Sequence, residues 1–306
     1  MTHKSILLLI TGLLAAFTAA ADFEAGLNAY DQHDYATALA QWQPIAERGD
    51  PHAQYNLGLL YFCGQGVPQD YGKAADWYRK AAEQGVAAAQ YNLALMYANG
   101  QGVAQNTQEA AKWFQKASEQ GVGEADQGLG DIYHDGENAL RNYSDAEKWY
   151  RQAAEQGSAS AAFSLGVMYD VGQGVTQNYE EAIKWYTKAA NAGYAPALTN
   201  LGILYYNAQG VKRDLVQAYV WMARAQKMGD PRAAQLFRTT AERMKPKEIK
   251  QAQALVGQWQ PASQPANRFQ NAKLFKPRDA APATTGSADR EEVPASAEPA
   301  SHWSRP

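Results

Sequence analysis

The chain has 306 residues, and its 28 Lys and Arg against 31 Asp and Glu give a formal net charge of −3. This balance has no basic excess and therefore argues against a nucleic-acid-binding protein. A single cysteine, Cys63, excludes an internal disulfide, so stability must come from packing, for which the chain is long enough.

Residues 1–21, MTHKSILLLITGLLAAFTAAA, have the three parts of a secretory signal peptide. Lys4 precedes an apolar run from Ile6 to Phe17, and small residues follow it. Cleavage is expected before Asp22. A membrane anchor is the alternative, but the run is shorter than the ~20 apolar residues that a bilayer span needs. We therefore expect an exported protein with no stable membrane span.

From residue 50 to residue 229 the sequence repeats itself with a period of 36 residues, and no insertion interrupts it. The residues that keep this step are Gly49, Gly85, Gly121, Gly157, Gly193 and Gly229; Trp77, Trp113, Trp149, Trp185 and Trp221; Tyr61, Tyr97, Tyr133, Tyr169 and Tyr205; Ala53, Ala89, Ala125, Ala161 and Ala197; and Leu57, Leu93, Leu129, Leu165 and Leu201. Such a period is typical of stacked structural units that share one core.

Each unit is predicted to begin with a helix. In the first unit, Ala53, Leu57 and Leu60 have the spacing of one face of a helix near residues 52–63, and Tyr61 extends that face. The glycines of CGQGV then end the helix. We expect this face to lie in the core.

A second helix is predicted over about residues 71–83. Its inner face alternates small and large residues, which are Ala74, Ala75, Tyr78, Ala81 and Ala82. This alternation lets two helices approach closely at the alanines and interlock at the tyrosine. Gly85 stands where a left-handed C-cap glycine belongs.

The combined pattern resembles a known family. A-x-x-x-L-G-x-x-Y, then G-x-G-V, then A-x-x-W-Y/F-x-K-A-x-E-x-G, is similar to the Sel1-like repeat (SLR), a 36-residue relative of the tetratricopeptide repeat; here it reads AQYNLGLLYFCGQGVPQDYGKAADWYRKAAEQG. The resemblance covers five repeats over residues 50–229. It implies an all-α fold, a right-handed α-α superhelix (solenoid) of helical hairpins.

The resemblance also implies a role. It indicates a non-catalytic adaptor or scaffold that binds a protein partner, without a cofactor, and we expect a monomer. Together with the signal peptide it predicts a periplasmic or secreted bacterial protein. The partner and the biological process stay open.

The ends of the solenoid are predicted to differ from the repeats. Residues 22–49 look like a shorter tetratricopeptide hairpin, and residues 230–259 look like a capping pair of helices, which solenoids need to cover their last apolar face. Residues 260–306 are rich in Pro, Ala and Ser and are predicted to be disordered. Within them RFQNAKLFK, residues 268–276, is either a docking segment or, as we favour, part of a solvated tail.

Motifs that carry chemistry are missing from the sequence. It contains no H-E-x-x-H, no G-x-S-x-G and no phosphate loop, because GQGV lacks the G-K-[ST] that reaches phosphate. Cysteine-rich members of the family are described as β-lactam-binding proteins or weak β-lactamases, which is the alternative function. Their paired cysteines are absent, however, and Cys63 is best interpreted as a tolerated loop thiol.

One unit collects acidic and imidazole side chains within about three helical turns. They are Asp126, Asp131, His134, Asp135 and Glu137. Such groups could hold a cation, but variable loop polarity explains them equally, and we favour that interpretation. No metal site is predicted.

A second stripe on the first helices is the predicted partner site. It starts at His52, Tyr55, Leu59 and Phe62, and in tetratricopeptide-like solenoids this stripe lines a concave groove. The predicted groove residues are Tyr55, Leu59, Phe62, Tyr91, Leu95, Gln127, Asp131, His134, Phe163, Asp170, Thr199 and Tyr206. An unburied apolar stripe usually marks a binding site. The alternative is that neighbouring first helices cover it.

Overall fold

The computed structural model describes residues 22–136 and 141–259, and within these ranges the chain forms helices and no strand. This confirms the predicted all-α solenoid. The predicted signal peptide and the Pro-rich tail, with its segment 268–276, lie outside the described residues. In the described ranges no helix has the length and apolarity that crossing a bilayer requires.

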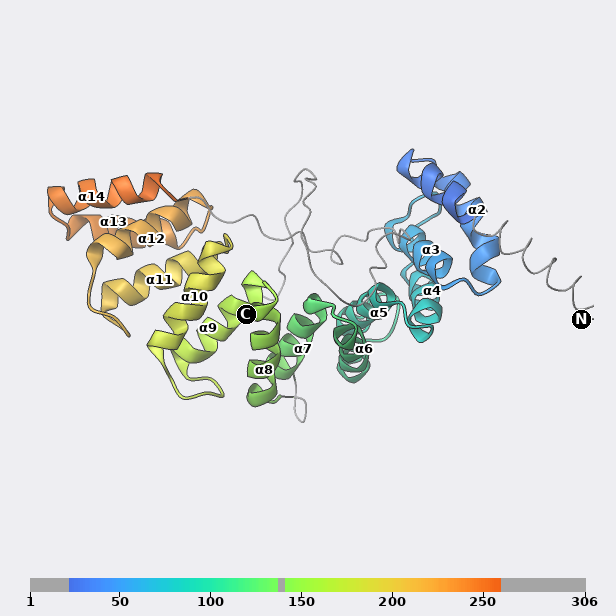
Figure 1. The fold of residues 1–306 in the computed structure, drawn as a ribbon, viewed down its shortest axis with the longest axis horizontal. Helices are drawn as coiled ribbons and strands as arrows, with labels where there is room; N and C mark the ends of the chain where they lie inside the picture. Colours follow the sequence, from blue (N-terminus) through green and yellow to red (C-terminus); the bar gives the residue numbers. More distant parts are fainter. Residues whose placement is uncertain (1–21, 137–140, 260–306) are drawn as a thin grey trace, which may run out of the picture. The chain divides into compact units, whose positions relative to one another are not determined.

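Residues 22–31 are helical and precede α2 (Tyr35–Glu47). Each repeat then adds a first and a second helix. The first helices are α3 (Pro51–Cys63), α5 (Ala87–Asn99), α7 (Gly123–Asp135), α9 (Ala159–Val171) and α11 (Ala195–Asn207). The second helices are α4 (Tyr71–Glu83), α6 (Thr107–Glu119), α8 (Tyr143–Glu155), α10 (Tyr179–Asn191) and α12 (Leu215–Lys227). From α2 to α12, every helix packs on the helix that follows it (Figure 1).

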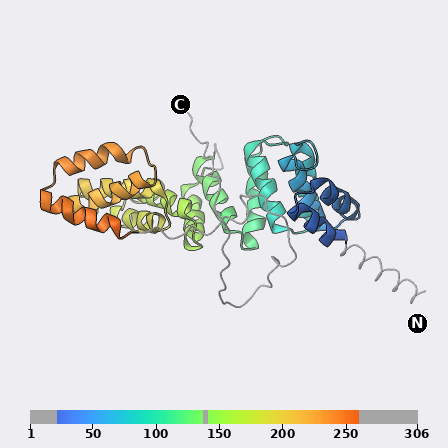
Figure 2. The ribbon, with the colours of Figure 1, turned by 90° about the horizontal axis from the view of Figure 1, so that it is seen from above.

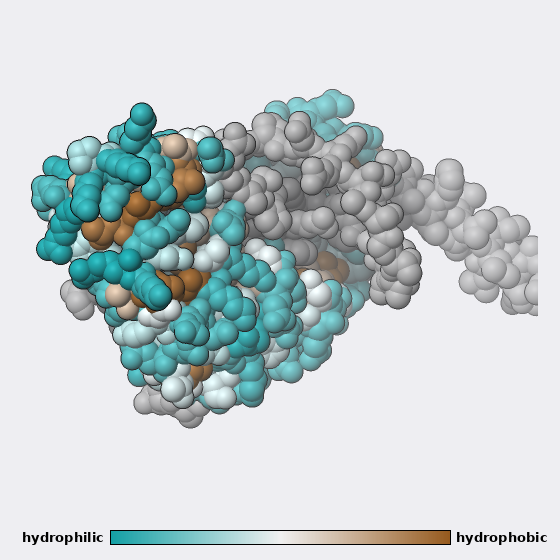
Figure 3. Space-filling model, turned by 60° about the vertical axis from the view of Figure 1, so that its left-hand side comes forward, coloured by the Kyte–Doolittle hydropathy of each residue, from teal (hydrophilic) through white to brown (hydrophobic). Residues whose placement is uncertain are grey.

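The last two helices are α13 (Ala233–Glu242) and α14 (Pro246–Gly257). Both pack on α12, beside which they lie when the ribbon is seen from above (Figure 2). In the view that brings this end forward, the surface is mostly hydrophilic and has several apolar patches (Figure 3). The apolar side chains that are partly buried against the cluster of α12–α14 are Leu215, Val216, Phe237, Ala241, Ile249 and Leu255.

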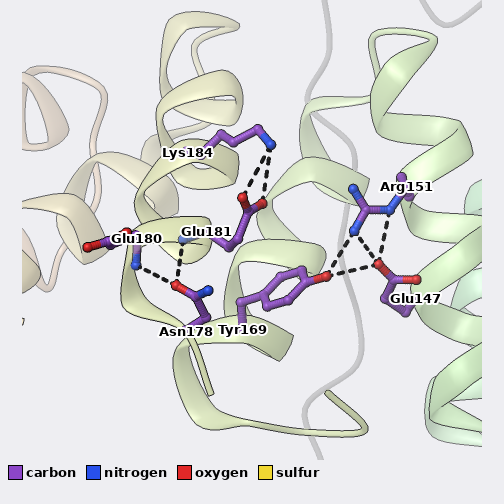
Figure 4. Close-up of polar contacts among 7 residues, drawn as sticks. All are labelled: Glu147, Arg151, Tyr169, Asn178, Glu180, Glu181 and Lys184. Atoms are coloured by element: carbon purple, nitrogen blue, oxygen red, sulfur yellow. Dashed lines mark hydrogen bonds and ion pairs between the residues drawn. The ribbon is translucent and has the colours of Figure 1, made fainter. Parts of the chain in front are cut away.

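Side-chain caps explain where the second helices begin. The residue before each of them is Asp or Asn, and its side chain accepts a hydrogen bond from a backbone N–H of the first turn. These caps are Asp70, Asn106, Asn142, Asn178 and Asp214. Figure 4 shows Asn178 accepting from the N–H groups of Glu180 and Glu181.

Left-handed residues explain where helices end. Gly85 has φ 90°, which confirms the predicted C-cap region after α4. Most first helices end the same way, as α3 does at Gly64 with φ 69°. After α11 the corresponding residue is Ala208, with φ 62°, so this turn carries a strain that glycine avoids elsewhere.

The predicted core stripes are buried. The five repeated alanines from Ala53 to Ala197 have no exposed surface, and the five repeated leucines from Leu57 to Leu201 are at most 1% exposed. The second-helix face around Tyr78 is buried too. Tyr61 is an exception, because it is half-exposed.

Close approach between helices depends on glycines that face aromatic rings. A Cβ on Gly58 in α3 would lie 2.6 Å from the ring of Tyr78 in α4, and Gly130 and Gly166 meet Tyr150 and Tyr186 in the same way. In the unit of α5 and α6 the partner residues differ. There Phe114 lies against Gly128 of the following helix, at 2.7 Å from a Cβ built on it.

Candidate interaction surface

Four residues of the predicted groove are buried, so the expectation of an open stripe is wrong at Tyr55, Leu59, Tyr91 and Thr199. Side chains from neighbouring helices and connections cover these positions. The Tyr55 side chain is hydrogen-bonded to Asn92 of the next first helix, and burial raises its pKa above the usual range.

Tyr91 and Thr199 are covered by the same kind of contact. Burial raises the pKa of Tyr91, and the charges of Glu124 and Asp131 on α7 add to the rise. Thr199 Oγ1 donates a 2.8 Å hydrogen bond to Asp230, the residue between α12 and α13. Thr199 therefore holds the C-terminal end together and does not face a partner.

Eight residues of the predicted groove are half-exposed. They are Phe62, Leu95, Gln127, Asp131, His134, Phe163, Asp170 and Tyr206. With Val167 and Ile203, which are also half-exposed, they make up what we call the first-helix face. Packing within the solenoid leaves these residues of the first helices partly accessible.

Aromatic side chains of this face are held by rings beneath and beside them. Phe163 lies 5.6 Å from the ring of Tyr186 and 5.1 Å from that of Tyr194. Phe62 contacts Tyr71 edge-on, with ring centroids 5.1 Å apart. Such packing restricts the rotamers of side chains that remain available for contact.

Two carboxylates of the face, those of Asp131 and Asp170, each accept a hydrogen bond from a tyrosine hydroxyl of a second helix. Tyr150 of α8 donates to Asp131 at 2.8 Å, and Tyr186 of α10 donates to Asp170 at 3.1 Å. Asn200 of the next first helix donates to the Tyr186 hydroxyl at 3.0 Å. Each tyrosine thus links a second helix to the first helix of the same repeat.

Burial sets the ionisation of these carboxylates. It raises the pKa of Asp131 to about 6; the Tyr150 hydrogen bond opposes this rise and the charge of Asp135 adds to it. Burial also raises the pKa of Asp170. Tyr150 and Tyr186 are not among the predicted site residues, although both occupy the repeat position of Tyr78, one residue after the repeated tryptophan.

His134 connects two units. Its Nδ1 lies 2.6 Å from Asp135 Oδ1, and its Nε2 lies 3.1 Å from Oε1 of Gln173, in the turn after α9. Gln127 makes a comparable link, since Ser158 and Ser160 both donate to its Oε1. Both polar groups are engaged within the solenoid.

The acidic group that could hold a cation does not form one site among the described residues, where no three His, Cys, Asp or Glu side chains gather around a common point. Asp126 is buried and accepts hydrogen bonds from Ser118, Gln152 and Gln156. Burial raises its pKa. Glu137 lies outside the described residues. Cys63 is the exposed last residue of α3.

Charge is divided between the two kinds of helix. The five first helices of the repeats contain no Lys or Arg. Their acidic residues are Glu124, Asp126, Asp131, Asp135 and Asp170. The second helices carry the basic residues Lys73, Arg79, Lys80, Lys112, Lys116, Lys148, Arg151, Lys184, Lys188, Arg224 and Lys227.

Basic side chains of the second helices are mostly used within the solenoid. Arg151 of α8 donates to Glu147 and, at 2.9 Å, to the hydroxyl of Tyr169 in α9, while Lys184 pairs with Glu181 (Figure 4). Lys80 lies 3.9 Å from the ring centroid of Trp77. Of these contacts, the one between Arg151 and Tyr169 joins neighbouring helices, and the others each lie within one helix.

The arrangement agrees with comparisons to known proteins. The Sel1 repeat family model matches residues 51–86, 87–122, 123–158, 159–194 and 195–230. No curated protein matches the chain.

Two solved structures are similar over most of the chain. One is a protective antigen present in uropathogenic Escherichia coli strains that displays an SLR fold; identity is 34% and the TM-score 0.69, over 82% of this chain and 56% of that one. The other is a Sel1 repeat protein from Oxalobacter formigenes, with 30% identity and a TM-score of 0.62, over 77% of this chain and 98% of that one. The chain thus spans little more than half the length of the antigen.

Proposed function

Since this chain belongs to the Sel1 repeat family, whose members are typically protein interaction scaffolds, we propose that it is an exported, non-catalytic scaffold that binds a partner protein on its first-helix face. The partner contributes an extended peptide or a helix, the two forms of polypeptide that lie along a row of repeats. The protein acts as a monomer.

One observation carries this proposal. Leu95, Phe163 and Tyr206, in the second, fourth and fifth repeats, remain half-exposed on a face that also has fully buried positions such as Tyr91 and Thr199. Aromatic and aliphatic side chains that the fold leaves accessible are typical of interaction sites. The packing of Phe163 against Tyr186 and Tyr194 fixes its position, which lowers the entropy lost on binding.

A site-specific photo-crosslinker tests the surface in the producing cell. Placed at Leu95, it is expected to yield a discrete crosslinked species, whose partner is identified by mass spectrometry. Placed at Lys80, an exposed residue of α4, it is expected to yield none. Equal crosslinking at both positions would contradict the proposed surface.

Export has a separate test. Fractionation of the producing cells is expected to find the protein outside the cytoplasm, and N-terminal sequencing of the mature protein is expected to begin at Asp22. A protein that keeps residues 1–21 and stays in the cytoplasm would contradict export but leave the scaffold function open.

A further inference from the structure

The chemistry of the partner can be narrowed from the distribution of charge on the first-helix face. Among the ion pairs of the described residues, none includes Asp131 or Asp170. Each accepts a hydrogen bond from a neutral tyrosine hydroxyl. His134 and Asp135 are the other titratable groups near Asp131, and they are hydrogen-bonded to each other.

Asp126 differs from Asp131 and Asp170 in its exposure and in the number of hydrogen bonds that its carboxylate accepts. Asp126 is 1% exposed and accepts from three side chains. Asp131 and Asp170 are half-exposed and have fewer donors, although a carboxylate has room for about four hydrogen bonds. Each therefore retains accepting capacity on its accessible side.

The neighbours of Asp131 along the face are apolar. Leu95, Asp131, Val167 and Ile203 occupy the same position in four consecutive repeats, so aliphatic side chains stand on both sides of the Asp131 carboxylate. At another repeat position Asp170 is preceded by His134 and followed by Tyr206. A ligand that crosses these repeats meets an apolar position, a carboxylate and another apolar position in turn.

The spacing of packed helices converts this order into a sequence pattern. Neighbouring helix axes lie about 8–10 Å apart, and an extended peptide advances about 3.3 Å per residue. Successive repeats are therefore about three residues of extended peptide apart. If a basic residue of the peptide lies opposite Asp131, the peptide residues about three positions before and after it lie opposite Leu95 and Val167.

We propose that the first-helix face binds an extended peptide segment in which lysine or arginine side chains reach Asp131 and Asp170, while large apolar residues about three positions from the one at Asp131 contact Leu95 and Val167. This inference rests on the proposed function and specifies its partner. The basic groups complete the hydrogen bonding of the two carboxylates. The first helices themselves contain no Lys or Arg that would compete with them.

A defined peptide array tests this chemistry with the purified protein. Its peptides carry Lys, Glu or Ser at a central position and Phe, Leu or Ser three residues to each side, in all combinations. We expect retention of peptides with central Lys and apolar flanks, and about tenfold weaker retention by the variant Asp131→Asn/Asp170→Asn. Asparagine keeps an oxygen for the tyrosine hydroxyls, so the fold is expected to persist.

The matched control is Asp76→Asn/Glu83→Gln, which removes the same amount of charge from exposed positions of α4 and is expected to leave retention unchanged. Asp170→Asn alone is the second variant, should the double variant melt earlier than the parent. Retention that ignores the central residue, that favours Glu, or that survives the double variant would overturn the inference and leave the scaffold function standing. Retention of no peptide, together with an absence of crosslinks at Leu95, would overturn both.

Discussion

The side-chain amide of Gln84, at the end of α4, donates a 2.8 Å hydrogen bond to Oε1 of Gln54 in α3. The Gln54 amide in turn donates to the carbonyl of Ala46 in α2 at 3.1 Å. Three consecutive helices are thus joined through one buried glutamine. The contact recurs one repeat later, where Gln120 donates to Gln90 at 2.7 Å.

The two residues that form this pair change together from one repeat to the next. In the third repeat Gln156 donates to Asp126 at 2.8 Å. In the last two repeats the corresponding pairs are apolar, Ala162 with Ala192 and Leu198 with Met228. Both members of each pair therefore share polarity, as expected if a buried polar group must keep its partner.

Removal of one member tests the strength of this contact. Gln84→Ala leaves the Gln54 oxygen without its donor and is expected to lower the free energy of unfolding by about 1 kcal/mol, measured by urea denaturation. Gln115→Ala, on the exposed side of α6, is the control and is expected to change it little. Equal effects of the two changes would mean that the Gln84 contact contributes nothing measurable.

The close contact between α3 and α4 makes a second prediction. Gly58→Ala places a methyl group 2.6 Å from the Tyr78 ring, so the helices must separate, at a cost of about 1–3 kcal/mol. The melting temperature is expected to fall accordingly.

Gly72→Ala is the matched control for Gly58. Gly72 lies in the first turn of α4, its nearest neighbour is an Asp70 side-chain oxygen at 3.3 Å, and alanine favours the helix. We expect an unchanged or higher melting temperature. If Gly72→Ala destabilised as much as Gly58→Ala, the effect would not come from the tyrosine contact.

Stability is expected to depend on pH through Asp131. Its pKa is raised from 3.8 to about 6, so between these values the folded chain binds more protons than the unfolded chain. The contribution of Asp131 to stability therefore decreases as pH rises through this interval. At pH 7.5 Asp131→Asn is expected to raise the free energy of unfolding by about 1–3 kcal/mol, a gain that shrinks towards pH 4.

Thermal melts of the parent and variant across pH 4 to about 8 measure this difference. Asp76→Asn removes an exposed carboxylate and is expected to show no such trend. A constant difference between Asp131→Asn and the parent at every pH would show that the effect is one of packing. Loss of stability at pH 7.5 would contradict the raised pKa.

The C-terminal end makes a fourth prediction. Arg224 of α12 lies between the rings of Trp221 and Trp259, 4.9 Å and 5.1 Å from their centroids, and donates to the Leu255 carbonyl of α14 at 3.1 Å. Arg224→Ala is expected to weaken the attachment of α14 by about 1–2 kcal/mol. Hydrogen exchange is expected to accelerate in α14 and to stay unchanged in α3 and α4.

Arg224→Lys separates the two contributions to this attachment. It keeps the charge near the rings but loses the planar group that donates to Leu255 while stacking, so an intermediate exchange rate is expected. Exchange in α14 that does not respond to Arg224→Ala would mean that apolar packing alone holds the helix.

The sequence by itself determined the helices and the main core stripes. The 36-residue step places Ala53, Leu57 and their equivalents on one helical face, and the burial of such a face follows from helical geometry within a single unit. The helix ends were equally predictable, because Asp70 and Gly85 act on backbone groups within their own turn. All of these are local properties.

Only the tertiary structure decided which part of the second stripe stays accessible. Tyr91 and Leu95 both lie on that stripe, yet Tyr91 is buried and Leu95 is half-exposed. The difference depends on what packs against each position, as the Phe114 ring of α6 does against Tyr91. The period fixes which residues recur but not the distance between the repeats that carry them.

Tertiary packing also decides the environment of the polar groups of the face. The sequence placed Asp126 and Asp131 in one acidic group, whereas the fold gives Asp126 three donors and Asp131 the single hydroxyl of Tyr150. Those partners come from other helices, up to 30 residues away. A carboxylate's environment is set by what packs against it, and for that the three-dimensional arrangement of the helices is required.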